Sequence, residues 1–278
     1  MAIKIMLDAG HYTNYNQSKV FKSYYEGNMV WKLQSYLKKE LEEYGFSVST
    51  TRSSRDKDKA LYDRGYMAKG YDVFLSLHSN ACDNEAVDRV VIIKGYDQKD
   101  TLASKFGKAI TDVMGVKQSP QIYIKKNNSG GEYYGVLRGA KAAGVANRFI
   151  LEHGFHTNTK TAKWLYKDEN IKKIAIAEAK VLADYYGYKK KTTNGSTNSS
   201  TSSWENGDYN CKVKATANLN LRTGRGTSYD IIYTIPKGTI FEVSYVLNGW
   251  GSTWDFKDKC GYVSMDYGYV SMDYVEKI

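Results

Sequence analysis

Apolar runs typical of strands alternate with helical repeats over the first two thirds of the chain. Apolar positions recur with helical spacing over residues 26–44, and Gly45 can end this helix. Further helices are predicted at residues 59–69, 101–115 and about 159–186. Strands are predicted at residues 3–7, 46–51, 72–77, 90–94, 121–125 and 148–152. This alternation predicts an α/β fold, a mostly parallel sheet with helices on both faces.

Residues 189–207 interrupt the pattern, because they are rich in Ser, Thr, Asn and Gly and have no apolar repeat before Trp204. Such a composition cannot bury a core, so it predicts a flexible linker between a first domain, residues 1–188, and a second domain, residues 208–278. The second domain contains short β-type segments separated by Gly turns, which predicts a small all-β barrel.

The second domain ends in a tandem heptad, GYVSMDY, at residues 261–267 and 268–274. Because seven is an odd number, the two copies would face opposite ways within one continuous strand. The repeat therefore predicts either two strands or one unpaired copy, and both remain open.

Charge is distributed unevenly between the two predicted domains. Residues 1–190 contain 31 Lys and Arg against 21 Asp and Glu, whereas residues 191–278 contain nine of each. A net charge of +10 in the first part predicts an anionic partner such as nucleic acid, a membrane or an acidic polymer, although basic surfaces also serve solubility alone. No run of about 18 apolar residues occurs, so we expect no transmembrane helix. Three widely spread cysteines argue against a disulfide framework.

Three predicted strands lead into side chains that suit metal chemistry. His11 follows the first predicted strand, His78 follows the third, and Glu152 ends the last. In open α/β sheets ligands bind beyond the carboxyl ends of the strands, so we expect these three side chains at one rim. Glu26, at the start of the first helix, can point toward the same rim.

Two neutral imidazoles and one carboxylate form a catalytic zinc set that leaves a fourth position for water. A carboxylate outside the metal set would then be the general base. This division assigns His11, Glu26 and His78 to one zinc ion and Glu152 to the base. The alternatives are core or capping roles for the histidines and a helix N-terminal charge for Glu26.

An ordered set of short motifs connects these residues to a known family. The motifs are D-x-G-H at residues 8–11, a Glu fifteen residues later, T-R at 51–52, S-x-H-x-N at 76–80 and E-x-G-F-x-x-N at 152–158. Over residues 2–187 the chain resembles the zinc-dependent N-acetylmuramoyl-L-alanine amidases of the type 3 family. The resemblance implies that His11, Glu26 and His78 bind zinc. It also implies that Glu152 is catalytic and that the fold is a sheet with flanking helices.

The sequence departs from the usual pattern of this family at three positions. Lys69 stands where the family usually has Asn, and His153 and His156 stand where it commonly has apolar residues. Strand alternation places His153 on the face opposite Glu152, so we do not expect it to be a metal ligand. His156 is expected in the loop after the strand, where it either contacts substrate or is solvated.

Other polar residues near the expected rim have two interpretations each. Asn80 lies two residues beyond His78, where it either orients water or substrate or caps the end of the strand. Arg52 and Arg64 either meet substrate carboxylates or form ion pairs, and ion pairing is favoured.

Residues 208–278 resemble bacterial SH3-like domains that bind cell walls, on the motif N-L-R-x-G-x-G-x-x-Y at residues 220–229. The two resemblances together imply an enzyme that cuts the amide between N-acetylmuramic acid and L-alanine in peptidoglycan, whose anionic polymers match the basic first domain. We expect a phage endolysin, made in the host cytoplasm without a signal peptide and released to the wall by a holin, with a bacterial autolysin as the alternative.

Three other function classes fit less of the sequence. A non-catalytic wall-binding protein would not need all four residues of the expected site. A nucleic-acid binder would be expected to show a helix-turn-helix cue, a basic stripe with interleaved aromatics or zinc-finger spacing. A cysteine peptidase using Cys82 would be expected to place this residue at a helix start. We therefore expect neither a nucleic-acid partner nor insertion into a membrane.

Overall fold

The computed structural model describes residues 2–190 and most of residues 204–278. Within the second range it does not describe residues 206, 228, 248, 257 and 259–267. The chain divides into two compact units, Met1–Thr192 and Thr193–Ile278. The predicted linker at residues 189–207 therefore lies mostly outside the described residues. Among the helices that are described, none is both long enough and apolar enough to cross a membrane.

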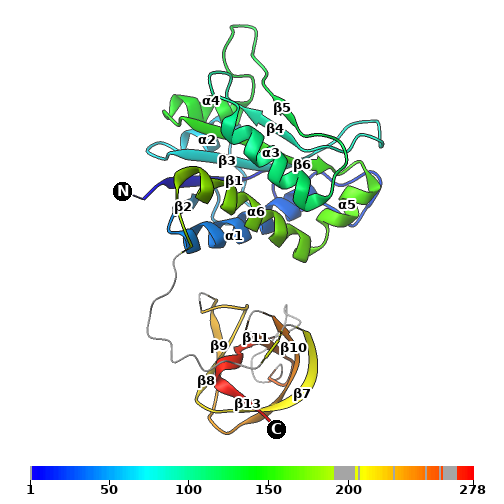
Figure 1. Cartoon of the computed structure of the whole chain (residues 1–278), viewed down its shortest axis with the longest axis vertical. Helices are drawn as coiled ribbons and strands as arrows, with labels where there is room; N and C mark the ends of the chain where they lie inside the picture. The colour runs from blue at the N-terminus through cyan, green and yellow to red at the C-terminus, as the bar shows by residue number, and fades with distance from the viewer. Residues whose placement is uncertain are drawn as a thin grey trace. The chain divides into compact units, whose positions relative to one another are not determined.

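The first unit is built on a six-stranded sheet in the order β2-β1-β3-β6-β4-β5 (Figure 1). The strands are β1 (Lys4–Ala9), β2 (Ser47–Thr50), β3 (Val73–Asn80), β4 (Val91–Lys94), β5 (Gln121–Tyr123) and β6 (Asn147–Phe155). The first three and β6 run parallel to one another, whereas β4 runs antiparallel to β6 and parallel to β5. The prediction of a mostly parallel sheet is confirmed, and the reversal is confined to the β4–β5 edge.

Helices cover both faces of this sheet, as the sequence predicts. They are α1 (Glu26–Tyr44), α2 (Leu61–Tyr66), α3 (Thr101–Met114), α4 (Gly135–Ala142), α5 (Thr159–Leu165) and α6 (Asp168–Tyr186). On one face α1, α3 and α6 pack against alternate strand residues such as Leu7, Leu75 and Leu151. On the other face Phe74 and Ile150 pack with α4. The period-two alternation of the strands thus divides their side chains between two cores.

Helix α4 is not predicted by the sequence pattern, because two of its eight residues are glycines. These glycines serve packing. A Cβ on Gly139 would lie 2.0 Å from the carbonyl oxygen of Tyr62, and a Cβ on Gly65 would lie 1.9 Å from that of Val136. Helices α2 and α4 therefore approach backbone to backbone, which explains glycine inside two short helices.

Two other helical segments differ from the expectation. Helix α2 is shorter than the predicted residues 59–69, and the stretch predicted as helical at residues 159–186 forms two helices. The break between α5 and α6 is stabilised by Asn170, whose side-chain amide donates to the carbonyl oxygen of Trp164 at 3.0 Å. A terminal carbonyl of α5 thus finds a partner in the first turn of α6.

The second unit is an all-β domain with strand order β13-β7-β10-β11-β12-β8-β9. Its strands are β7 (Gly207–Ala215), β8 (Leu219–Arg222), β9 (Ile231–Ile235), β10 (Ile240–Leu247), β11 (Trp250–Thr253), β12 (Gly268–Ser271) and β13 (Val275–Lys277). They pair antiparallel, and Val213, Phe241 and Val270 belong to their common core. The second copy of the heptad, residues 268–274, forms β12 and a 3₁₀ turn, whereas the first copy lies outside the described residues.

Candidate active site and metal centre

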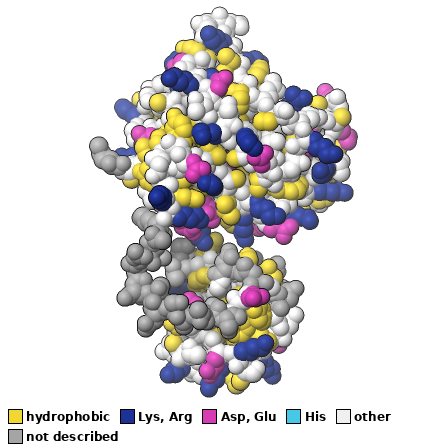
Figure 2. Space-filling view, in the orientation of Figure 1, with side chains coloured by type: hydrophobic (Ala, Val, Ile, Leu, Met, Phe, Trp, Pro, Cys, Tyr) yellow, Lys and Arg dark blue, Asp and Glu magenta, His cyan; other side chains and the backbone are white. Residues whose placement is uncertain are grey.

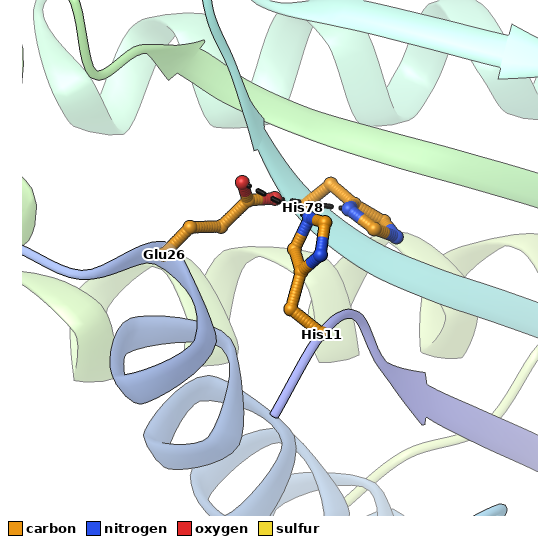
Figure 3. Close-up of side chains that lie close together, drawn as sticks. All are labelled: His11, Glu26 and His78. Atoms are coloured by element: carbon orange, nitrogen blue, oxygen red, sulfur yellow. Dashed lines mark hydrogen bonds and ion pairs between the residues drawn. The ribbon is translucent and has the colours of Figure 1, made fainter. Parts of the chain in front are cut away.

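Three side chains from separate segments meet at the carboxyl end of the sheet (Figure 3). His11 follows β1, Glu26 is the first residue of α1, and His78 lies near the end of β3. The carboxylate of Glu26 faces both imidazoles: its Oε2 lies 3.2 Å from Nε2 of His11, and its Oε1 lies 2.9 Å from Nδ1 of His78. One donor atom from each residue lies within 4.8 Å of the other two. The structure thus brings together the three residues that the sequence predicts as a metal set.

Two glycines make this convergence possible. A Cβ on Gly10 would lie 2.2 Å from Cε1 of His78, so the residue before His11 has to leave room for the other imidazole. A Cβ on Gly27 would lie 1.9 Å from the carbonyl oxygen of Tyr12, where the loop after β1 crosses the start of α1. His11 itself has a φ of 59°, a left-handed conformation that costs a non-glycine residue about 1–2 kcal/mol. The glycines on either side of this crossing are therefore part of the geometry of the site.

Glu26 is buried and carries the negative charge of the cluster. The side-chain amide of Asn16 and the backbone N–H of Ser79 also donate to its carboxylate, the latter at 2.9 Å. Burial alone would raise the pKa of Glu26, but hydrogen bonds from His11 and His78 outweigh it and hold the pKa far below its usual range. Burial would likewise lower the pKa of His78, but its hydrogen bond to Glu26 and the charge of Glu26 raise this pKa to about 9. The cluster therefore attracts positive charge, as a cation site must.

The donor set fits zinc better than a hard cation. Zinc takes imidazole and carboxylate ligands, whereas calcium and magnesium prefer sites made of oxygen atoms. Asp8, the carboxylate of the first motif, takes no part in the cluster. It is buried and accepts hydrogen bonds from the hydroxyl groups of Thr51 at 2.6 Å and Ser76 at 2.7 Å. Asp8 therefore ties β1 to β3 and to the segment after β2.

Glu152 lies beside the cluster on the neighbouring strand. It is paired with His78 in the register of β3 and β6, so both side chains lie at one level on the same face of the sheet. Its Oε2 is buried and has no hydrogen-bond partner among the described residues. Burial, assisted by the charge of Glu26, raises the pKa of Glu152 to about 7, although His78 and His153 oppose the rise. A carboxyl group with this pKa can both accept and release a proton near neutral pH.

Comparison with protein families assigns the region that contains this cluster. The family profile described as N-acetylmuramoyl-L-alanine amidase matches residues 5–184, which is most of the chain. The chain belongs to the N-acetylmuramoyl-L-alanine amidase family. A second profile, described as a bacterial SH3 domain, matches residues 217–276. The chain thus contains an amidase domain followed by an SH3 domain, in agreement with both resemblances seen in the sequence.

A curated relative of the amidase domain comes from Staphylococcus epidermidis and is named "Probable cell wall amidase LytH". It is 32% identical over 157 residues, which cover 55% of this chain and 48% of the relative. The chain therefore spans about half the length of the curated relative that it matches.

Solved amidase structures share the fold of the amidase domain. The catalytic domain of CwlV from Bacillus (Paenibacillus) polymyxa var. colistinus gives a TM-score of 0.58 at 20% identity, covering 67% of this chain and 99% of that one. An N-acetylmuramoyl-L-alanine amidase from Clostridium difficile 630 gives 0.57 at 19% identity, with coverages of 67% and 97%. AmiC2 of Nostoc punctiforme gives 0.56 at 20% identity, with coverages of 66% and 97%. At these identities the likeness establishes the fold alone.

The other polar residues predicted near the site of the amidase domain are bound within the protein. The side-chain oxygen of Asn80 accepts a hydrogen bond from the N–H of Ala81 at 2.8 Å, as a strand-end cap would, and its contact with water or substrate stays a prediction. Arg64 is buried and pairs with Asp58. Arg52 is buried and donates to three backbone carbonyl groups. Ion pairing, the favoured interpretation, therefore holds for Arg64, whereas Arg52 binds the backbone.

His156 is neither the solvated loop residue nor the substrate contact that the sequence suggests. Only 1% of it is exposed, its Nδ1 lies 2.9 Å from Oγ of Ser79, and its ring stacks on Tyr24. Burial lowers the pKa of His156. The difference arises because the loop after β6 folds inward. The N–H of His156 donates to the carbonyl of Asn80, and the hydroxyl of Ser18 donates to the carbonyl of His156.

A buried pair on the other face of the sheet is not evident from the sequence. Nε2 of His153 lies 2.7 Å from Oε1 of Glu178 in α6, and neither side chain is exposed. The pKa of His153 is raised, because the charge and hydrogen bond of Glu178 outweigh the effect of burial. Strand alternation correctly places His153 opposite Glu152. The signal that could identify its partner is Glu178 itself, a charged residue at an otherwise apolar position of the helical repeat of α6.

Proposed function

We propose that this protein hydrolyses the amide bond between N-acetylmuramic acid and L-alanine in bacterial peptidoglycan, with one zinc ion held by His11, Glu26 and His78. The observation that carries the proposal is the meeting of two imidazoles and a buried carboxylate beside a second carboxylate, Glu152, on the adjacent strand. Membership of the amidase family supports the same reaction. When bound, a zinc ion would polarise the amide carbonyl as a Lewis acid and would lower the pKa of the attacking water to about 7.

Glu152 is the general base and then the general acid of this reaction. It accepts a proton from the attacking water, whose oxygen forms the new bond to the lactyl carbonyl carbon. It then gives the proton to the amide nitrogen as the C–N bond breaks, so that the products are a free carboxyl group on the sugar and a free L-Ala amine. The raised pKa of Glu152 suits both steps, because the group has to be ionised before the attack and protonated before the amine leaves.

The metal assignment is tested by replacing one side chain at a time in the full-length protein. We expect His11→Ala and His78→Ala to lose zinc, and Glu152→Ala to keep zinc but lose hydrolysis. Elemental analysis gives the metal content, and circular dichroism verifies that each variant is folded. Full zinc occupancy in both histidine variants would refute the ligand set, and hydrolysis by zinc-loaded Glu152→Ala would refute the base.

The bond that is cut can be identified by mass spectrometry of digested peptidoglycan with and without a chelator. We expect free L-Ala N-termini that appear only when no chelator is present. New reducing sugar ends would instead identify a glycosidase. Free L-Ala N-termini in the presence of the chelator would refute the dependence of the reaction on a metal.

We further propose that the SH3 domain and the basic amidase domain hold the enzyme on the wall, whose peptidoglycan and associated polymers are anionic. The bacterial SH3 profile supports a wall ligand. Lys and Arg side chains are spread over the face of the first unit seen in Figure 2 rather than gathered in one patch, which suits an extended polymer. Co-sedimentation with purified walls tests this: we expect binding that weakens when the anionic polymers are extracted. Equal binding to extracted walls would refute their role.

For the biological role, we propose a phage endolysin that is made in the host cytoplasm and reaches the wall after release by a holin. The support is the order of the two matched regions, an amidase domain followed by an SH3 domain. Co-expression in a susceptible host is the test, with lysis expected only when a holin is present. Lysis without a holin would favour the alternative, a bacterial autolysin with the same chemistry.

A further inference from the structure

Behind the candidate zinc site, on the opposite face of the sheet, lies the buried pair formed by His153 of β6 and Glu178 of α6. Both side chains are completely buried, and their nearest atoms lie 2.7 Å apart. The apolar residues of the core on this face include Leu77, Leu151 and Leu182. A buried ionic pair is often no more stable than apolar residues of the same volume, so stability alone does not account for it.

The second ring nitrogen of His153 reaches the strand that carries a proposed metal ligand. Its Nδ1 lies 2.7 Å from the carbonyl oxygen of His78. A carbonyl oxygen can only accept, so Nδ1 carries a hydrogen and donates it. Nε2 then faces Glu178, and a proton lies between Nε2 and Oε1 whichever of the two atoms holds it. The carboxylate therefore fixes the orientation of the ring, with Nδ1–H directed at the carbonyl of His78.

The contact occurs where the two strands lose their regular pairing. His78 is paired with Glu152, but Asn80 is paired with Phe155, so β6 contains one residue more than β3 over this step. Gly154, inside the bulge, has a φ of +72°. A bulge disrupts the ladder locally and re-aims neighbouring side chains. The ring of His153 supplies a hydrogen bond to the strand end at this irregular point.

We propose that His153 and Glu178 are positioning residues for the zinc site, which hold the backbone of His78 from the face opposite the metal. The inference rests on the proposed function, because it concerns the proposed ligand set. Nε2 of His153 is held by Glu178, and Nδ1 holds the carbonyl of His78. The imidazole of His78 is thereby kept at its place beside Glu26. Neither positioning residue needs to contact zinc or substrate.

The test is the zinc affinity of the full-length protein, measured by competition with a chromophoric chelator. His153→Val removes the ring, and Glu178→Leu removes the group that holds the ring in its orientation. Both are expected to weaken zinc binding by about tenfold or more, the effect typical of losing an outer-shell partner. Glu178→Gln keeps a hydrogen-bonding group opposite Nε2, so its affinity is expected to stay close to that of the wild type.

A matched control is available at the other end of the same strand. Arg148, the second residue of β6, forms a buried pair with Glu132 at 2.7 Å. Glu132→Leu breaks a buried ion pair of similar kind without a contact to His78. We expect this variant to unfold at a lower temperature in the presence of chelator while its zinc affinity remains unchanged. General destabilisation is thereby separated from positioning.

The outcomes distinguish this inference from the proposed function. A wild-type protein that does not bind zinc would overturn the proposed function itself. Zinc binding by the wild type with the same affinity in His153→Val and Glu178→Leu would overturn the positioning role alone, and so would an equal loss of affinity in Glu132→Leu. Glu178→Leu decides the question if His153→Val does not fold. Loss of affinity in Glu178→Gln equal to that in Glu178→Leu would overturn the hydrogen-bond assignment.

Discussion

Replacing Glu152 with Gln is expected to change both the stability of the protein and its catalysis, because both depend on the carboxyl group of this side chain. The substitution preserves the shape of the side chain but replaces an ionisable oxygen by an amide. In the metal-free protein the ionised carboxylate is the costly form, because one of its oxygens is buried without a hydrogen-bond partner among the described residues. Burial accordingly raises the pKa of Glu152 from 4.5 to about 7. We therefore expect Glu152→Gln to stabilise the metal-free protein and to inactivate the enzyme.

The size of the stability effect follows from this shift. At 1.36 kcal/mol per pKa unit, the change from 4.5 to about 7 corresponds to about 3 kcal/mol. In the unfolded chain Glu152 ionises near its ordinary pKa, whereas in the folded chain it ionises only near 7. Stability is therefore lost as the pH rises between these two values, and it stays lost above them. Glu152→Gln has no such loss, so its advantage over the wild type grows over the same pH range.

Thermal unfolding of wild type and variant in the presence of chelator measures this difference. A gain of about 3 kcal/mol raises the Tm of a domain of this size by roughly 6–12 °C. We expect this gain at pH values above 7, relative to acidic pH. At acidic pH the protonated Glu152 of the wild type and the Gln of the variant are both neutral. After zinc loading, hydrolysis of muropeptides by the variant is expected to be about 10²–10⁴-fold slower. The reasoning fails if both proteins show the same pH dependence of Tm, or if the zinc-loaded variant keeps its activity.

Three further outcomes concern other parts of the molecule. Gly10→Ala places a Cβ 2.2 Å from the imidazole of His78, so we expect a loss of zinc affinity in a chelator competition assay, and wild-type affinity would contradict the packing argument. Lysis of walls, followed by turbidity, is expected to slow as salt rises, because the Debye length shortens from about 30 Å at 0.01 M to about 8 Å at 0.15 M. A lysis rate that does not change with salt would refute the role given to the +10 charge. Cys82→Ser is expected to keep full activity, since the thiol donates to the carbonyl of Asn84 and contacts no histidine in the described part of the chain; inactivity would favour the cysteine peptidase.

The strands and the residues at their ends can be predicted from the sequence because both depend on local signals. A short apolar run ends at a polar residue, and parallel strands bring such ends to one edge of the sheet. His11, His78 and Glu152 are found by this rule. Helix α4 is not found, because the reason for Gly139 lies in α2, at the backbone of Tyr62. A glycine that permits close packing looks the same in a sequence as a glycine that ends a helix.

The two buried histidines show a second limit, which is the path of the chain after a strand. Alternation gives the face of His153 but not its partner Glu178, since the rotation of α6 about its axis is set by packing of the whole helix. For His156 no periodic rule applies, because β6 ends one residue earlier and the direction of the following loop depends on tertiary hydrogen bonds. Both positions are resolved only by contacts that are distant in the sequence.

These distant contacts explain how a short strand end can hold a proposed metal ligand in place. The carbonyl of His78 accepts from the ring of His153, and the next residue, Ser79, contacts Nδ1 of His156 through its hydroxyl group. The N–H of Ser79 also donates to the carboxylate of Glu26. The strand end is therefore fixed by two buried imidazoles and by the carboxylate that contacts both His11 and His78. If His11, Glu26 and His78 hold zinc as proposed, these bonds would preorganise the ligand set, and little of the binding free energy would be lost to rearrangement of the protein.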